Sequence, residues 1–365
     1  MEAYLDHAAT TPLRPEARDA MLPWLGGRHG NPSGMHGPAQ TARRAVEEAR
    51  DELAELLGCR PGDVIFTSGG TEADNLAVHG RSAAGPMACS SIEHHAVLEP
   101  VRAAGGRTLP VGADGVVDVG AVPADLRFLS VMLVNNEIGV VQPLAALRAA
   151  APDAVLHTDA VQSVTWLDVG TAAAPADLVS ISAHKFGGPQ GVGALVARDG
   201  AGVTAQLLGG GQERERRSGT QNVAGIAGMA AALRACHDSR AATVARLAVL
   251  RDRLADGLLG MVPGSIETGD RAAKVAGICS VAFEDVDAEA LLVLLDQQGV
   301  SGSAGASCAS GALEASHVLA ALGVPPSLGR GSLRLSLGWD TEEAEVDHAL
   351  AAVPAAVARL RRYEP

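Results

Sequence analysis

Lysine is rare in this 365-residue chain. Among 29 lysines and arginines, only Lys185 and Lys274 are lysines. A primary amine can lose its proton and form an imine with a carbonyl compound, whereas the guanidinium group of arginine stays protonated. Lys185 follows the apolar segment 178–181, and an amine at the end of a buried strand could do this chemistry. The alternative is a leftover surface lysine, which is what we expect of Lys274 in the polar segment 269–274.

Cys308 is the second candidate for chemistry. It lies in segment 301–311, in which every other residue is serine, glycine or alanine. This composition is typical of a flexible loop, and an exposed thiol in such a loop is a candidate nucleophile. The other four cysteines lie in helix or strand patterns, where packing explains them: Cys59, Cys89, Cys236 and Cys279. Five cysteines without a CxxC pair predict no disulfide framework and suit a reducing compartment.

Two further segments could bind an anionic or heterocyclic ligand. The turn 68–71 lies between a predicted strand and helix, where glycines, free N–H groups and the helix dipole favour a phosphate. Many such turns bind nothing, so this turn alone is weak support. Asp159 follows the predicted strand 154–158 and could hold a protonated ring nitrogen at the carboxyl end of that strand. A helix N-cap is an equally good explanation for Asp159.

Histidines and amides follow two more predicted strands. His94 and His95 are adjacent, so they do not share a helix face and indicate no metal site. His94 could stack on a flat cofactor or could be structural. Asn135 and Asn136 follow an apolar strand, where their amides could bind a ligand or cap a turn.

Apolar strands alternate with helices over most of the chain. Strands are predicted near 64–67, 86–90, 127–134, 154–158, 177–182 and 193–197, and helices over 39–57, from 71 onward and over 241–259. This alternation predicts an α/β fold with a mainly parallel sheet covered on both faces. After residue 263, a smaller α+β domain is predicted, with strands at 277–283 and 332–337 and helices near 287–298, 313–322 and 341–361.

Composition excludes several classes of protein. A net charge of −13 without a basic run argues against a nucleic-acid surface. No apolar stretch approaches the roughly 20 residues of a membrane helix, and the first residues lack the pattern of a signal peptide. We therefore expect a soluble, cytoplasmic protein that binds neither membrane nor nucleic acid directly.

The ordered set of these segments closely resembles the pyridoxal-phosphate-dependent cysteine desulfurases, the NifS/IscS-like group of the class-V aminotransferase family. Any one segment is modest support, whereas the whole series in this order is highly specific. The resemblance covers nearly the whole chain and is carried by segments 5–12, 30–33, 67–72, 93–97, 135–139, 157–162, 182–185, 217–220, the surroundings of Cys308, and 333–338.

The resemblance implies a fold-type-I transferase that acts as a homodimer with pyridoxal 5'-phosphate. It implies an N-terminal segment 1–14 packed on the small domain, a large cofactor-binding domain 15–260 and a small C-terminal domain 261–365 that carries Cys308. The implied residues fall into catalytic, cofactor-binding and substrate-binding groups. Lys185 would bind the cofactor as an imine, Asp159 its ring nitrogen, His94 its ring face and Gln162 its hydroxyl; its phosphate would be bound by Gly70, Thr71, Ser182 and His184, with Thr220 of the other subunit.

The same resemblance implies the reaction. Asn136, which also belongs to the cofactor site, and Arg334 would contact L-cysteine, with Asn31 nearby, and Cys308 would receive its sulfur as a persulfide while L-alanine leaves. The sulfur would pass to an acceptor protein, for which iron–sulfur cluster assembly, tRNA thiolation and DNA sulfur modification all remain open. The alternatives are a selenocysteine lyase or small-amino-acid aminotransferase on the same fold, and a non-catalytic sulfur carrier.

Overall fold

A seven-stranded sheet forms the centre of the structure, a computed structural model that describes residues 2–81, 84–198, 201–305 and 316–362. The strand order is β2-β8-β7-β6-β5-β3-β4. β8 is antiparallel to β2 and β7, and the other neighbours pair in parallel. The predicted mainly parallel α/β fold is therefore confirmed. The strands are β2 (Val64–Thr67), β3 (Met87–Ser90), β4 (Arg107–Leu109), β5 (Phe128–Ser130), β6 (Val155–Asp159), β7 (Leu178–Ser182) and β8 (Gly193–Ala197).

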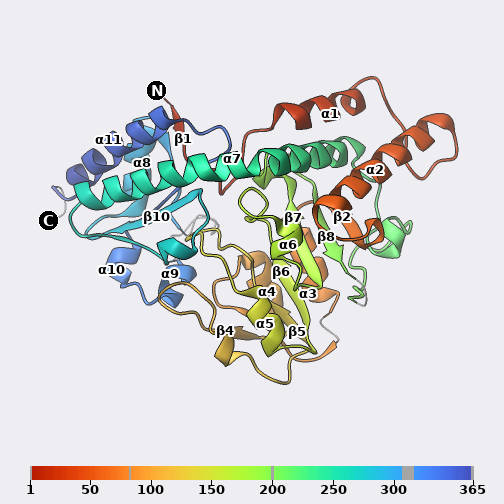
Figure 1. Cartoon of the computed structure of the whole chain (residues 1–365), viewed down its shortest axis with the longest axis horizontal. Coiled ribbons are helices and arrows are strands. Elements are labelled where there is room, and N and C mark those ends of the chain that lie inside the picture. Colours follow the sequence, from red (N-terminus) through yellow and green to blue (C-terminus); the bar gives the residue numbers. More distant parts are fainter. Residues whose placement is uncertain (1, 82–83, 199–200, 306–315, 363–365) are drawn as a thin grey trace.

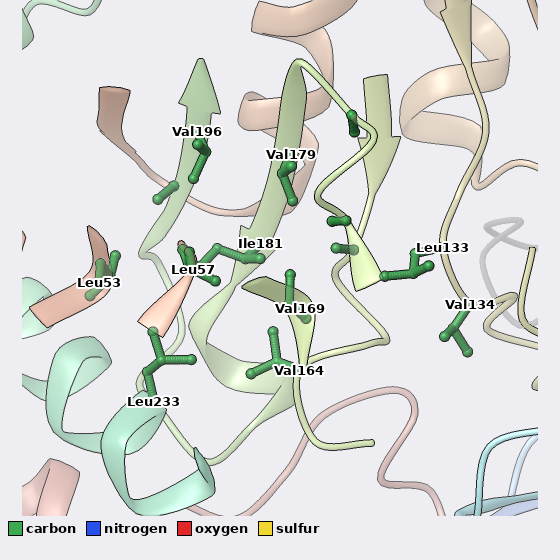
Figure 2. Packing of buried hydrophobic residues seen from close by; sticks show 14 of the residues in the cluster. Leu53, Leu57, Leu133, Val134, Val164, Val169, Val179, Ile181, Val196 and Leu233 are labelled. Atoms are coloured by element: carbon green, nitrogen blue, oxygen red, sulfur yellow. The ribbon is translucent and has the colours of Figure 1, made fainter. Parts of the chain in front are cut away.

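Helices cover both faces of this sheet because successive strand residues point to opposite sides. Val179 and Ile181 belong to the core under α2 (Gly37–Leu56) and α7 (Val223–Met261), as Figure 2 shows for Leu53 and Leu233 of those helices. Leu178 belongs to the opposite core, under α3 (Gly70–His79) and α4 (His95–Ala103). Burial on both faces explains why these strands are apolar without a break.

Helix α7 is about twice as long as the predicted helix 241–259. Figure 1 shows it running along the molecule, from α1 (Pro15–Leu25) and α2 at one end to α11 (Glu343–Leu360) at the other. Its first half is rich in glycine and alanine and lies close to its neighbours: a Cβ on Gly228 would be 2.6 Å from Cγ of Met21. Among the described residues, no helix is both long and apolar enough to cross a membrane.

The smaller part of the structure is built on an antiparallel sheet of order β12-β10-β9, with β9 at Ser265–Glu267, β10 at Ile278–Phe283 and β12 at Ser332–Ser336. Around it lie α8 (Ala288–Asp296), α9 (His317–Ala321), α10 (Pro326–Gly329) and α11. The N-terminal strand β1 (Ala3–Tyr4) pairs in parallel with β11 (Val300–Ser301) of this part. The domain boundaries at residues 14 and 260 stay a prediction, and α7 contributes side chains to the cores of both parts.

One predicted strand is shorter than expected. The apolar run 127–134 forms a strand only at Phe128–Ser130. Beyond it, the N–H of Met132 donates to the Glu93 carboxylate at 2.7 Å, and the N–H of Leu133 donates to the Asp159 carbonyl at 2.9 Å. The buried Glu93 side chain thus takes the place of a neighbouring strand as the hydrogen-bond partner on one side of this segment. The remaining short helices are α5 (Leu144–Ala150) and α6 (Val169–Ala172).

The expectation that Lys274 is a surface lysine is wrong. Its side chain is 0% exposed, and its Nζ lies 2.7 Å from Oε1 of Glu267 on β9. Burial lowers the pKa of Lys274, while the hydrogen bond to Glu267 acts in the opposite direction. The polar sequence around Lys274 contained no sign of this partner, because the pairing depends on how β9 lies against the turn at Arg271–Ala273.

We predict that Lys274→Met lowers the free energy of unfolding by about 1–3 kcal/mol, because Glu267 loses a buried charged hydrogen bond and keeps Arg271 as its partner among the described residues. Urea unfolding measures the change. Arg359→Met, at an exposed position of α11, is the control and should change it by less than about 0.5 kcal/mol. Equal stability of the two variants would contradict the role assigned to the Lys274 pair.

Candidate active site

Five strands end at the same edge of the large sheet and deliver the predicted residues there. In parallel strands the carboxyl ends share an edge, where open α/β sheets bind ligands. This edge borders a cavity of about 380 Å³. Its lining includes ten of the predicted site residues: Gly70, Thr71, His94, Asn136, Asp159, Gln162, Ser182, His184, Lys185 and Arg334.

Lys185 stands at the cavity on a short 3₁₀ turn, Ala183–Lys185, that directly follows β7. Its Nζ donates to the carbonyl oxygens of Ala8 at 2.5 Å and Ala9 at 2.9 Å. The Ala8 carbonyl also accepts from Nε2 of Gln162 at 2.6 Å. The N-terminal segment therefore holds both the amine and the amide in place.

Asp159 ends β6 and lies beside the strand that leads to Lys185. The side chain is buried, and its Oδ1 accepts a hydrogen bond from the N–H of Val161 at 2.8 Å. Burial raises the pKa of Asp159 to about 6, while the Val161 N–H and the charge of Lys185 act in the opposite direction. The carboxylate caps a turn rather than a helix, and it also lines the cavity; its pairing with a ring nitrogen stays a prediction.

His94 is both structural and part of the cavity. It is the N-cap residue of α4, where its Nδ1 accepts a hydrogen bond from the N–H of Ala96 at 3.1 Å. Burial, together with the charge of Lys185 and the neighbouring His95 and His317, lowers the pKa of His94 to about 4. The imidazole in the cavity is therefore neutral at pH 7.

The start of α3 lines the cavity with Gly70 and Thr71. The helix begins at Gly70 after Gly69, whose φ of 154° favours glycine, and no side chain caps its first N–H groups. A Cβ on Gly70 would lie 2.8 Å from Cγ2 of Val161, so the backbone approaches closely there. Ser182 and His184 lie along the same cavity, and His184 contacts Oγ1 of Thr10 at 3.1 Å. Burial and Lys185 lower the pKa of His184 to about 4.

Arg334 reaches the cavity from the smaller part. Its Nη2 lies 2.8 Å from Oδ1 of Asp6, and its Nη1 donates to the Asn136 carbonyl at 3.0 Å. The residue is 4% exposed, and its buried Nε has no hydrogen-bond partner among the described residues. A buried guanidinium with an unused donor suits a carboxylate ligand.

Three predicted residues are not placed at this cavity. Asn31 and Thr220 are exposed on this chain and do not line it. Cys308 lies outside the described residues, between Gly305 and Ser316. Of the other cysteines, Cys89, Cys236 and Cys279 are buried, as their patterns indicated, whereas Cys59 is half-buried.

Four titratable residues at the cavity were missed as site residues: Asp74, His95, Glu137 and His317. Asp74 comes four residues after Gly70 on a predicted helix, so the spacing could have placed it on the same face. Glu137 follows Asn136 directly. No sequence pattern indicated that His317 lines the cavity, because its position depends on how α9 packs there.

Comparison with known proteins agrees with this geometry. The family model "Aminotransferase class-V" matches residues 3–349. The chain belongs to the class-V aminotransferase family. An "IscS-like cysteine desulfurase" of Mycobacterium tuberculosis is 43% identical and the match covers 99% of this chain and 97% of that protein.

Solved structures of the family share the fold. A "NifS-like protein" superposes with a TM-score of 0.91 at 30% identity, covering 98% of this chain and all of that one. The structure described as "SspA in complex with cysteine" gives a TM-score of 0.79 at 29% identity, over 92% of this chain and 98% of that one. The predicted membership in the NifS/IscS-like group is therefore confirmed.

We predict that His94 stays neutral down to about pH 5 in the protein without cofactor. Because the unfolded chain binds this proton near pH 6.5 and the folded chain only near 4, His94 lowers stability as the pH falls below about 6.5, by roughly 1.4 kcal/mol per pH unit. NMR of the histidine ring, assigned with His94→Gln, measures the titration. A midpoint near 6.5 would show that the ring is not held as described.

Proposed function

We propose that the cavity binds pyridoxal 5'-phosphate and converts L-cysteine to L-alanine, with Cys308 receiving the sulfur as a persulfide. The observation that carries the proposal is the placement of Lys185, Asp159 and Arg334 around one cavity. Family membership supports pyridoxal-phosphate dependence, and the relatives named cysteine desulfurase support the reaction class. An acceptor protein then takes the sulfur from Cys308.

The residues present fit the cofactor. The uncapped start of α3 with Ser182 and His184 suits the phosphate, and the Asp159 carboxylate suits a protonated ring nitrogen. His94 would face the ring, and Gln162 would bind its hydroxyl. When bound, pyridoxal phosphate withdraws electrons from the substrate carbon that carries the amino group, which makes the proton on that carbon removable.

Substrate orientation follows from Arg334. Its unused Nε and the Nη2 now paired with Asp6 can bind both oxygens of the L-cysteine carboxylate. Asp6 keeps the guanidinium in place before the substrate arrives. Asn136, whose carbonyl also holds Arg334, lies on the same side of the cavity, and Asn31 is proposed to lie near the substrate in the dimer.

Proton transfer is assigned to Lys185. A neutral amine is a base, and the Ala8 and Ala9 carbonyls keep its Nζ aimed at one place. The neutral His94 can accept a proton from a substrate thiol. Cys308 then attacks the substrate sulfur: the S–S bond forms, the C–S bond breaks, and its electron pair is protonated as the methyl group of L-alanine. The net reaction turns L-cysteine and the Cys308 thiol into L-alanine and the Cys308 persulfide.

Rival functions differ in the residues that they need. A small-amino-acid aminotransferase would not need Cys308, and a sulfur carrier without catalysis would not need Lys185. A selenocysteine lyase would use the same cavity and differ in its preference for selenium over sulfur.

We predict that two variants both lose sulfur transfer but differ in whether they keep the absorption band of the cofactor. Lys185→Ala should remove the visible absorption band of the bound cofactor and all alanine formation, because the amine is lost. Cys308→Ala should keep the band but form neither persulfide nor sulfide. Absorption spectra, an alanine assay and intact-protein mass spectrometry after addition of L-cysteine measure these changes. Full alanine formation by Cys308→Ala would contradict the proposed sulfur transfer.

Dimerisation is part of the proposal, because the exposed Thr220 is assigned to the phosphate of the partner subunit. Arg217, just before it, pairs with Glu72 on α3 of its own chain, at 2.8 Å from Nε to Oε1. This pair holds the segment before Thr220 in a defined conformation within its own chain. We also propose that the enzyme acts in the cytoplasm, where an acceptor protein takes over the sulfur.

We predict that Thr220→Ala weakens cofactor binding about tenfold, through one lost hydrogen bond to the phosphate of the partner subunit. Mixed dimers of Lys185→Ala and Thr220→Ala chains would then contain one intact site. At limiting cofactor they should match mixed dimers of Lys185→Ala and wild-type chains, which serve as the control. Activity no higher than that of Thr220→Ala alone would place Thr220 at the site of its own chain.

A further inference from the structure

Glu137 lines the cavity and has no part in the steps above. It is 5% exposed, and burial raises its pKa to about 7, while Ser316 and Arg334 act in the opposite direction. Its backbone is fixed by Asn135, whose Oδ1 accepts the N–H groups of Glu137 and Ile138, each at 2.9 Å. A buried acid on a rigid turn costs free energy, so its contacts need an explanation.

One oxygen of Glu137 meets two segments of the chain. Oε2 accepts a hydrogen bond from Oγ of Ser316 at 2.6 Å. That hydroxyl oxygen also accepts the N–H of Leu319 at 3.1 Å and so caps α9. The same Oε2 lies against Gly305, where a Cβ would come within 2.7 Å. A side chain at this position would therefore displace the Glu137 carboxylate.

Gly305 and Ser316 are the described residues on either side of 306–315, the segment that contains Cys308. We propose that Glu137 is a positioning residue for sulfur transfer, which fixes both ends of this segment beside the cavity by binding Ser316 and packing on Gly305. The inference rests on the proposed function, in which Cys308 accepts the sulfur. A group tethered at two fixed points explores a smaller volume than one whose ends move, so it meets its target more often.

A positioning role of this kind affects the second half of the reaction and not the first. Removal of the Cα proton uses Lys185 and the residues that bind substrate and cofactor. Among the described residues, the hydrogen bond to Oε2 of Glu137 comes from Ser316, and Arg334 acts on this carboxyl only through its charge. Formation of the persulfide additionally needs the Cys308 thiol to arrive. A residue that merely supports the fold of the cavity would affect both halves alike.

The test uses the holoenzyme with Glu137→Ala, Glu137→Gln and Ser316→Ala. Glu289→Ala, at an exposed position of α8, is the matched control for loss of one acid. Single-turnover mass spectrometry gives the rate at which the Cys308 persulfide forms from L-cysteine. Exchange of the Cα proton of L-alanine in D₂O reports the first half without Cys308, and the cofactor absorption band reports site integrity.

We expect Glu137→Ala to slow persulfide formation about 10- to 100-fold, through loss of a charged hydrogen bond, and to leave exchange and the band within about threefold. Ser316→Ala should act in the same direction. Glu137→Gln retains an acceptor oxygen and should recover most of the rate. Equal slowing of exchange and persulfide formation, or no slowing of either, would overturn the positioning role. Absence of persulfide on wild-type Cys308 would instead overturn the proposed function.

Discussion

A carboxylate taken out of water beside a half-buried amine, at one edge of the sheet, is the constraint on which this structure depends. β6 and β7 are parallel neighbours, so their carboxyl ends place Asp159 and Lys185 beside the same cavity. Burial of the Asp159 carboxylate alone would be costly. Here the opposite charges, the Val161 N–H and the carbonyls of Ala8 and Ala9 offset that cost. The N-terminal segment that supplies these carbonyls is bound to the smaller part through β1 and β11, so both parts of the fold are needed to hold the amine.

Electrostatics around the cavity follow from burial as much as from charge. Burial keeps His94 and His184 neutral and raises the pKa of the Asp74 and Glu93 carboxyls. The cavity therefore combines a few charged side chains with neutral side chains that can exchange protons. Such an arrangement suits a cofactor that is itself anionic at one end and cationic at the ring.

The sequence predicted the sheet well because its strands are apolar on both faces. The bounds of β2 and β8 agree with the prediction at both ends, and ten predicted site residues line one cavity. Helix α1 was missed because Ala17 is the one residue that it buries completely, which leaves no apolar stripe. The first half of α7 was missed because its glycines and alanines pack on several sides and leave no amphipathic period. His317 was missed because its surroundings come from segments distant in the sequence. Lys274 was missed because its burial depends on a bridge to Val140 and on a turn that brings it back to Glu267, neither of which local composition describes. Glu137 stood in a recognised motif, but its contacts with Gly305 and Ser316 appear only in three dimensions.

The rarity of lysine provides the most direct test of the central claim. Borohydride reduction fixes a carbonyl compound permanently on the amine with which it has condensed, and peptide mapping by mass spectrometry then locates it. With pyridoxal 5'-phosphate bound, the account predicts the added mass on the peptide that contains Lys185 and none on the peptide that contains the buried Lys274. A label on Lys274, or no label on Lys185, would contradict the account.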